Sequence, residues 1–219
     1  MASRPGWSCQ AISTAALSLE GGLAEVELHR IGRNKRRERN RGLRRGLEVR
    51  ITRDPDLLAA YHPLHLAACR VWGVAPMPLE FLLDVLADPD GGAFFSCASL
   101  QGRVVGGHLC LHRGERVLAW NGVTDPAVSK THYPATGLVC ADIEEACRRG
   151  AAWLDLGGSG DKGSLAGFKE FFGAELQMRG LYRRDTAGMR LLRMGRGLVS
   201  SLRGSGRARR WHDAGGRDR

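Results

Sequence analysis

A carboxylate, a glycine-rich loop and a lysine follow one another in the second half of the chain. The short apolar run 151–156 predicts a buried strand, with Asp155 near its end. Four glycines follow within seven residues, and they allow a tight turn that exposes backbone N–H groups to a ligand. The segment 164–172 then predicts a short helix that carries Lys169 and stops at Gly173. Ligands commonly bind where the strands of an open α/β sheet end, so this stretch is a candidate site.

The same order also fits an ordinary connection between a strand and a helix, and spacing alone does not decide between the two. The glycines do not form a P-loop, because no Gly-x-x-x-x-Gly-Lys-Ser/Thr order is present. An unpaired carboxylate in an apolar strand is costly, so Asp155 needs a partner, either Lys169 or a loop N–H. Such a partner would make Asp155 a structural support rather than a base. The loop residues that could line a ligand are Gly157, Gly158, Ser159, Gly160 and Lys162.

Three further side chains, those of His108, Cys110 and His112, alternate along one predicted strand and therefore share a face. Zinc accepts such ligands, but a fourth is not evident, and a packed strand explains the pattern equally well. We predict no metal site. The spacing supports no Ser-His-Asp arrangement either.

The net charge of +10 is concentrated in two flanks of the chain. Residues 30–53 carry a net charge of +9 and residues 183–219 one of +8, whereas residues 54–182 carry −5. Such flanks could hold RNA, an anionic lipid or a phosphorylated substrate, or could be a plain solvated surface. No apolar run approaches the roughly 20 residues needed to cross a bilayer.

Periodicity predicts the elements that must position these residues. The stretch 24–28 fits a short strand. A basic helix over 34–47 breaks at its glycines, and a strand at 47–52 follows. Asp54-Pro55 starts a helix to about Val71, with Pro63 kinking or dividing it. The remaining predicted elements are a helix at 79–86, meander strands at 93–100, 103–111 and 116–123, a helix at 134–149 and a last strand at 175–182. This order predicts an α/β (α+β) fold with a mixed, mostly antiparallel sheet and helices on both faces.

The order resembles the acyl-CoA N-acyltransferase fold of the Gcn5-related N-acetyltransferases (GNAT). Particular segments narrow the resemblance to the Fem-type branch: Gly102 to Leu111, Leu118 to Asp125, Tyr133-Pro134, Trp153 to Gly157, Phe168-Lys169 and Phe172-Gly173. That branch adds amino acids to peptidoglycan precursors from aminoacyl-tRNA and includes related proteins of polysaccharide and lipid pathways. The resemblance covers residues 30–183 and is that of a single-domain or N-terminally shortened member.

The resemblance implies three catalytic candidates. Lys169 matches the family's Phe-Lys position, where a lysine could hold a phosphate or polarise the reacting carbonyl; a solvated helix lysine is the alternative. Asp155 would support Lys169. Tyr133 could contact substrate or donate a proton, although core packing explains a tyrosine there as well.

Substrate-binding residues follow from the same resemblance. Trp120 and Asn121 end a meander strand where acyl donors lie in this fold. Arg36 and Arg37 could hold the diphosphate of a nucleotide or lipid-linked sugar, or could belong to a plain basic surface. The donor would be acetyl-CoA or aminoacyl-tRNA. No Arg/Gln-x-x-Gly-x-Gly/Ala sequence precedes Pro134, which favours aminoacyl-tRNA or an unusual donor.

We therefore predict an acyl- or aminoacyl-transferase acting on an amine of a peptidoglycan, polysaccharide or related cell-envelope precursor. The alternative is a non-catalytic, degenerate acetyltransferase-fold module that binds RNA or an anionic surface. The expected organisation is a poorly defined segment 1–29, the acetyltransferase-like domain 30–183 and a basic tail 184–219 with a weak apolar helix at 189–202. Neither a secretory signal nor a C-x-x-C pair is present, so we expect a cytoplasmic protein with reduced thiols and an option of peripheral contact with an anionic membrane.

Overall fold

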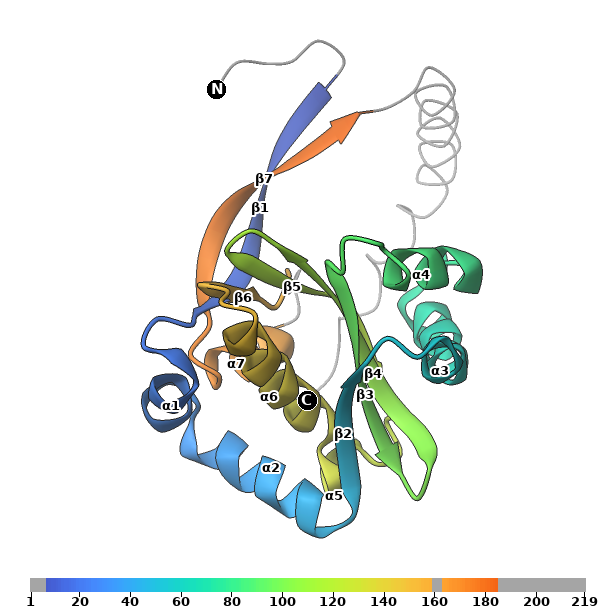
Figure 1. Cartoon of the computed structure of the whole chain (residues 1–219), viewed down its shortest axis with the longest axis vertical. Coiled ribbons are helices and arrows are strands. Elements are labelled where there is room, and N and C mark those ends of the chain that lie inside the picture. The colour runs from blue at the N-terminus through green and yellow to red at the C-terminus, as the bar shows by residue number, and fades with distance from the viewer. Residues whose placement is uncertain (1–6, 159–162, 185–219) are drawn as a thin grey trace, which may run out of the picture. The chain divides into compact units, whose positions relative to one another are not determined.

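A computed structural model of the chain describes residues 7–158 and 163–184. Its centre is a seven-stranded sheet in the order β2-β3-β4-β5-β6-β1-β7 (Figure 1). Neighbouring strands from β2 to β5 are antiparallel, β5 and β6 run parallel, and β6 pairs antiparallel with β1. Helices cover both faces, so the predicted mixed, mostly antiparallel α/β fold is confirmed.

The strand boundaries follow the alternation of apolar and polar residues closely. The first four strands after the N-terminal one are β2 (Leu47–Thr52), β3 (Ala93–Leu100), β4 (Arg103–Arg113) and β5 (Arg116–Thr124). Tight turns with positive φ at Gly102 and Gly114 join the last three, as the meander prediction requires. The strand β6 (Trp153–Asp155) is shorter than predicted, and β7 (Glu175–Arg184) is longer.

Two helices cover one face of the sheet. Helix α3 (Pro55–Trp72) begins at the cap Asp54, whose carboxylate accepts from the N–H of Asp56, and it passes through Pro63 without a break. Helix α4 (Leu79–Leu86) follows after a short loop. Their buried residues Leu58, Tyr61, Leu82 and Leu86 pack with Phe95 and Leu109 of the sheet. The alternative that Pro63 divides the first helix is wrong.

The opposite face is covered by α6 (Pro134–Arg148), which packs Val139, Ile143 and Ala146 into the largest core cluster. The basic helix α2 (Arg33–Arg44) lies against α6, and Thr136 donates to Glu38 across that contact (2.7 Å). The prediction that the helix breaks at Gly42 is wrong, because Gly42 lies buried within α2. A Cβ there would collide with the carbonyl oxygen of His132 in the short helix α5 (Ser129–His132), which the sequence did not predict.

The N-terminal segment is more ordered than its sequence indicates. Strand β1 (Trp7–Ser18) joins the sheet beside β6, with Leu17 opposite Leu154. The predicted strand at 24–28 is wrong, because this stretch forms α1 (Gly22–Glu25) and the π-helical turn η1 (Val26–Arg30). Helix α7 (Gly163–Glu170) ends the set, and Gly173 follows with φ +79°.

The chain divides into two compact units, residues 13–179 and residues 1–12 with 180–219. Apart from the start of β1 and the end of β7, the elements above belong to the first. In the second, the hydroxyl of Ser8 donates to the carbonyl oxygen of Arg183 (3.4 Å). The predicted tail helix at 189–202 and the loop residues Ser159, Gly160 and Lys162 lie outside the described residues. Among the described helices, none combines the length and the apolar character that a membrane span requires.

Candidate functional site

Strands β5 and β6 separate at the centre of the sheet. Their pairing ends at Leu118 and Asp155, whereas β5 continues to Thr124. Just past this point the register of β4 against β5 shifts, so that Trp120 is the extra residue of a bulge. The β6-facing edge of this part of β5 thus lies outside the strand ladder. Such an edge offers backbone N–H and C=O groups to an extended ligand.

Asp155, at the end of β6, organises the start of the glycine-rich loop. One carboxylate oxygen accepts from the N–H of Gly157 (2.8 Å), and the other accepts from Thr14 (3.2 Å) and Arg116 (3.4 Å). The backbone of Gly157 has φ +73°, a conformation that favours glycine. The side chain is nearly buried, so these bonds supply the partners that a carboxylate in an apolar strand requires. Of the two predicted partners, the loop N–H is the one that bonds to Asp155.

Lys169 of α7 holds the same loop from the other side. It is only 5% exposed, and its Nζ donates to the carbonyl oxygens of Gly157 (2.8 Å) and Gly158 (2.9 Å). Burial lowers the pKa of Lys169, and the nearby Asp155 opposes that shift. Two of the three N–H donors are used in these bonds, so the alternative of a solvated helix lysine is wrong. Lys169 and Asp155 are brought together around Gly157 without bonding to each other.

Asn121 belongs to a buried polar cluster on the face covered by α3. Its side-chain oxygen accepts from the hydroxyl of Tyr61 (2.7 Å), and its nitrogen lies 3.5 Å from Nδ1 of His65. Nε2 of His65 accepts from the N–H of Met77 in the α3–α4 loop (3.0 Å). The neighbouring Trp120 packs edge-on against Phe81 of α4, with ring centroids 6.1 Å apart. Tyr61 and His65 were not among the predicted site residues, although their i, i+4 spacing places both side chains on the same face of an apolar helix.

We predict that His65 makes folding stability depend on pH. Burial, and next the neighbouring His62, lowers the pKa of His65 below the ordinary 6.5. As pH falls below about 6.5, the unfolded chain binds a proton that the folded chain does not, so stability should fall until the folded-state pKa is reached. Urea unfolding at several pH values measures this. The fall should be smaller in His65→Gln and unchanged in His29→Gln, whose histidine is exposed; equal slopes in all three proteins would contradict the prediction.

The other predicted site residues, on α2 and at the start of α6, form separate contacts. The hydroxyl of Tyr133 accepts from Arg41 (3.2 Å), whose guanidinium also lies over the tyrosine ring. Arg36 donates to the carbonyl oxygens of Glu27 (3.1 Å) and Leu28. Arg37 is exposed. One nitrogen of the Arg36 guanidinium is thus engaged with the backbone of η1.

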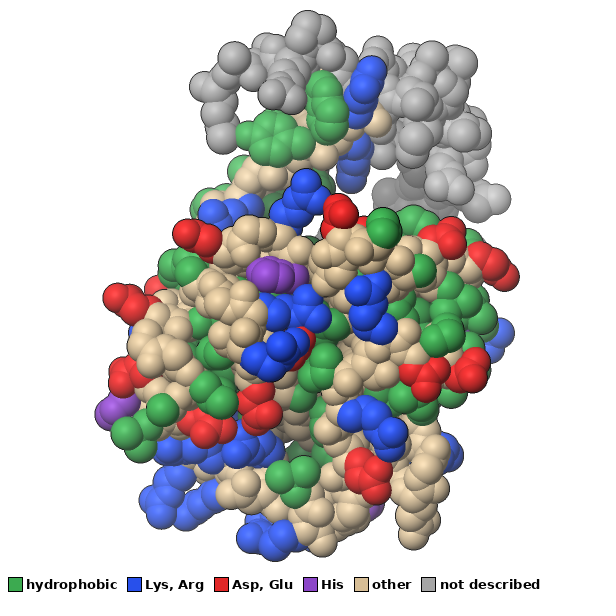
Figure 2. Space-filling model, viewed as in Figure 1, with side chains coloured by type: hydrophobic (Ala, Val, Ile, Leu, Met, Phe, Trp, Pro, Cys, Tyr) green, Lys and Arg blue, Asp and Glu red, His purple; other side chains and the backbone are tan. Residues whose placement is uncertain are grey.

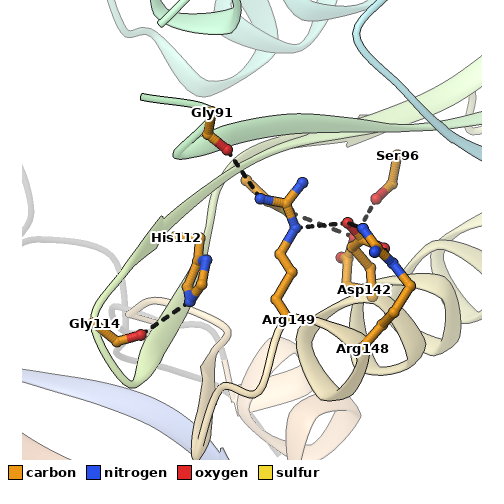
Figure 3. A network of polar contacts seen from close by, with 9 residues as sticks. Gly91, Ser96, His112, Gly114, Asp142, Arg148 and Arg149 are labelled. Atoms are coloured by element: carbon orange, nitrogen blue, oxygen red, sulfur yellow. Dashed lines mark hydrogen bonds and ion pairs between the residues drawn. The ribbon is translucent and has the colours of Figure 1, made fainter. Parts of the chain in front are cut away.

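A second buried polar cluster, also missed, lies between α6 and the sheet. Asp142 is fully buried, and it accepts from the hydroxyl of Ser96 (Figure 3). It also accepts from the thiol of Cys110 (3.4 Å), and Nδ1 of His108 lies 2.6 Å from it. His108 and Cys110 share a face, as predicted, but they face this carboxylate. The signal was present in the sequence, because Asp142 falls on the apolar side of its helix next to Ile143.

The end of α6 is tied to the loop that precedes β3. Arg149 donates to the carbonyl oxygen of Gly91 (3.0 Å; Figure 3), and it also donates to Glu145 on the last turn of α6 (2.6 Å). A nearby cavity of about 500 Å³ lies between the end of α4 and the β4–β5 turn and is lined in part by Asp88 and His112. Among the described residues, none of the predicted catalytic or substrate-binding side chains lines it.

Comparison with solved structures gives the same fold. FemX aligns with a TM-score of 0.64 at 15% identity, over 75% of this chain and 59% of that chain. The C-terminal domain of a protein assigned as a lysylphosphatidylglycerol synthetase, from Agrobacterium fabrum, aligns with 0.61 at 13% identity, over 89% and 67%. An aminoglycoside acetyltransferase from an uncultured soil metagenomic sample aligns with 0.53 at 14% identity, over 66% and 99%. This chain thus spans less than two thirds of the FemX chain.

A search of curated protein sequences gave no match. The model of the acetyltransferase (GNAT) domain family, in contrast, matches residues 29–170. This is more than half of the chain, and it contains the meander, the β5–β6 separation and the loop held by Asp155 and Lys169. The chain therefore belongs to the acetyltransferase (GNAT) domain family, a family of acyltransferases.

Proposed function

We propose that this protein transfers an acyl or aminoacyl group from a carrier to an amine. The observation that carries the proposal is the separation of β5 from β6 beside the bulge at Trp120. It leaves a strand edge on which the donor's chain can lie, with N–H groups close to the end of β6. Fixed N–H donors that meet developing negative charge are the principal means by which an acyl transfer is accelerated.

The reaction needs no covalent intermediate on the protein. The amine nitrogen attacks the donor carbonyl carbon, the bond from that carbon to the sulfur or oxygen of the carrier breaks, and the amine proton leaves with the carrier or to water. The protein's part is to hold both reactants in line and to stabilise the oxyanion. We assign Asp155 and Lys169 to positioning, because both bond to the loop backbone at Gly157 and Gly158.

We further propose that the acceptor reaches the bulge from the α3–α4 side. There Trp120 and Phe81 form an aromatic surface, and Asn121 lies behind them with Tyr61. Tyr133 we place at the other side, as a residue that holds α2 to α6 through Arg41. FemX and the lysylphosphatidylglycerol synthetase domain share the fold; an acceptor of the cell-envelope class, with aminoacyl-tRNA or acetyl-CoA as donor, is consistent with that likeness.

Donor-induced thermal stabilisation tests the proposal. The melting temperature of the full chain is measured with acetyl-CoA, with CoA, with aminoacyl-tRNA and with uncharged tRNA, each at low and at high salt. Binding to the folded state raises the melting temperature by mass action. The free energy of unfolding rises by about 2.7 kcal/mol when the ligand is at 100 times its Kd. A shift that requires the acyl or aminoacyl group identifies the donor class. Equal shifts with charged and uncharged tRNA, together with none from acetyl-CoA, would contradict acyl transfer.

A non-catalytic binding module is the second candidate, and one surface favours it. Arg33, Arg37 and Arg44 are exposed and lie one or two turns apart on α2. In the part of the chain that the structure describes, these three side chains form no hydrogen bond or ion pair, whereas Arg39 is paired with Glu27. A polyanion held by such a stripe would bind with a steep salt dependence and without regard to an acyl group. The uncharged-tRNA arm at two salt concentrations measures this.

A further inference from the structure

The end of α3 and the loop that follows it expose an apolar run. Every residue from Arg70 to Pro76 is exposed. Val71 is 84% exposed, Trp72 49% and Val74 52%, and Phe81 on the next helix is 47% exposed. We call Val71, Trp72, Val74 and Phe81 the apolar tip. Hydrophobic side chains gather on the α3–α4 side of the molecule in Figure 2. Several consecutive exposed apolar residues are not expected in a soluble protein unless they bind something.

The backbone around the apolar tip is well braced. Gly73 takes the left-handed conformation (φ +66°) that closes α3, with Val74 N–H bonded to the carbonyl oxygen of Cys69 (3.1 Å). Pro76 and Pro78 restrict the loop. The backbone N–H of Met77 donates to Nε2 of His65 (3.0 Å), and the carbonyl oxygen of Met77 lies 3.0 Å from Nε2 of His62. The apolar side chains are therefore presented by a fixed, convex turn, which binds without a large ordering cost.

The charge and the residue types of this turn indicate the class of partner that it would bind. Histidines aside, Arg70 is the only charged residue between Leu57 and Leu79. It stands next to the apolar tip, where a cation complements anionic lipid headgroups. Tryptophan is enriched at membrane–water interfaces, and aliphatic neighbours add buried apolar area in the acyl region. A convex turn of this composition suits a deformable bilayer better than a protein partner, which would need a preformed groove.

We propose that the apolar tip inserts into the surface of an anionic lipid bilayer and docks the protein there. Phe81 of the apolar tip packs against Trp120, the extra residue of the β5 bulge. Docking in this way would bring the opening between β5 and β6 close to molecules held in the bilayer. The inference concerns binding alone, and its test contains neither donor nor amine, so its outcome is independent of acyl transfer.

Vesicle sedimentation of the full chain tests the docking. Vesicles are made of phosphatidylcholine alone or of phosphatidylcholine mixed with phosphatidylglycerol, and each is used at low and at high salt. We expect binding to the mixed vesicles that persists in part at high salt, because apolar insertion is not screened. Val71→Ser combined with Val74→Ser should reduce the partition coefficient by about tenfold or more.

The matched control is Leu28→Ser combined with Leu43→Ser, two side chains that are 62% and 50% exposed outside the apolar tip. Its partition coefficient should stay within about twofold of the parent protein, since single exposed apolar residues are ordinary. Melting temperatures of both double variants check that the fold is kept. Equal binding by the Val71/Val74 variant and the parent would overturn the proposal. So would an absence of binding to both vesicle types, or binding that high salt abolishes completely.

Discussion

Asp142→Ala is expected to lower the free energy of unfolding by about 3–5 kcal/mol. The carboxylate is fully buried and is the common partner of Ser96, His108 and Cys110. Removing it leaves those groups without their partner inside the core and opens a cavity between α6 and the sheet. Urea unfolding at equilibrium gives the value. A loss below about 1 kcal/mol would mean that water or a side-chain rearrangement replaces the carboxylate.

Two further variants separate the role of Asp142 from a general effect on α6. Asp142→Asn keeps the volume but exchanges one acceptor oxygen for a donor, so we expect about 1–3 kcal/mol. Glu144→Ala changes a carboxylate on the same helix whose side chain is 51% exposed and 3.4 Å from Arg39. A surface pair of this kind contributes about 0–1 kcal/mol. Equal losses in all three variants would show that the buried contacts of Asp142 do not account for the effect.

Lys169→Met is expected to abolish the donor-induced rise in melting temperature and to lower the free energy of unfolding by about 1–3 kcal/mol. Methionine keeps most of the apolar stem but cannot donate to the carbonyl oxygens of Gly157 and Gly158. The carbonyl of Gly157 keeps the N–H of Ala15 (3.0 Å), so the loss falls mainly at Gly158. Thermal melts with and without each donor, together with urea unfolding, measure both effects.

The outcome distinguishes positioning from direct contact with the reacting group. If Lys169 acts through the loop, hydrogen exchange at the Gly157 and Gly158 amides should speed up in Lys169→Met even without donor. If Lys169 instead polarises the donor carbonyl, exchange should stay unchanged while donor binding is lost. Lys130→Met removes an exposed lysine and should alter neither quantity. An unchanged donor response in Lys169→Met would remove this residue from the site.

Local chemistry made much of the fold predictable from the sequence. Asp54-Pro55 begins α3 because the carboxylate caps a helix N-terminus and proline tolerates its first turn. The meander follows from period-two alternation with glycines at turns that require positive φ. The strand predicted at 24–28 was wrong because a short apolar stretch fits a strand and a helix equally. Here the packing of Val26 in the core favours the helix.

The candidate site was only half predictable. A carboxylate in an apolar strand must have partners, and the sequence correctly indicated a loop N–H as one of them. It did not indicate Thr14, which lies 141 positions away in the chain and meets Asp155 only because β1 inserts beside β6. Nor did the sequence indicate the bond between Tyr61 and Asn121, because Tyr61 lies on α3 and Asn121 on β5, 60 positions later in the chain.

The sequence by itself determined the family and most of the elements between residues 33 and 184 in their order, because caps, turns, periodicity and short motifs are properties of neighbouring residues. Only the tertiary structure decided which strands are adjacent, that Lys169 is buried against two carbonyls, and that Asp142 lies under His108. The alternation of apolar and polar residues indicates which face of a strand is buried, but it does not identify the helix or strand that packs on that face. That information appears only when long-range packing chooses one pairing for the whole sheet.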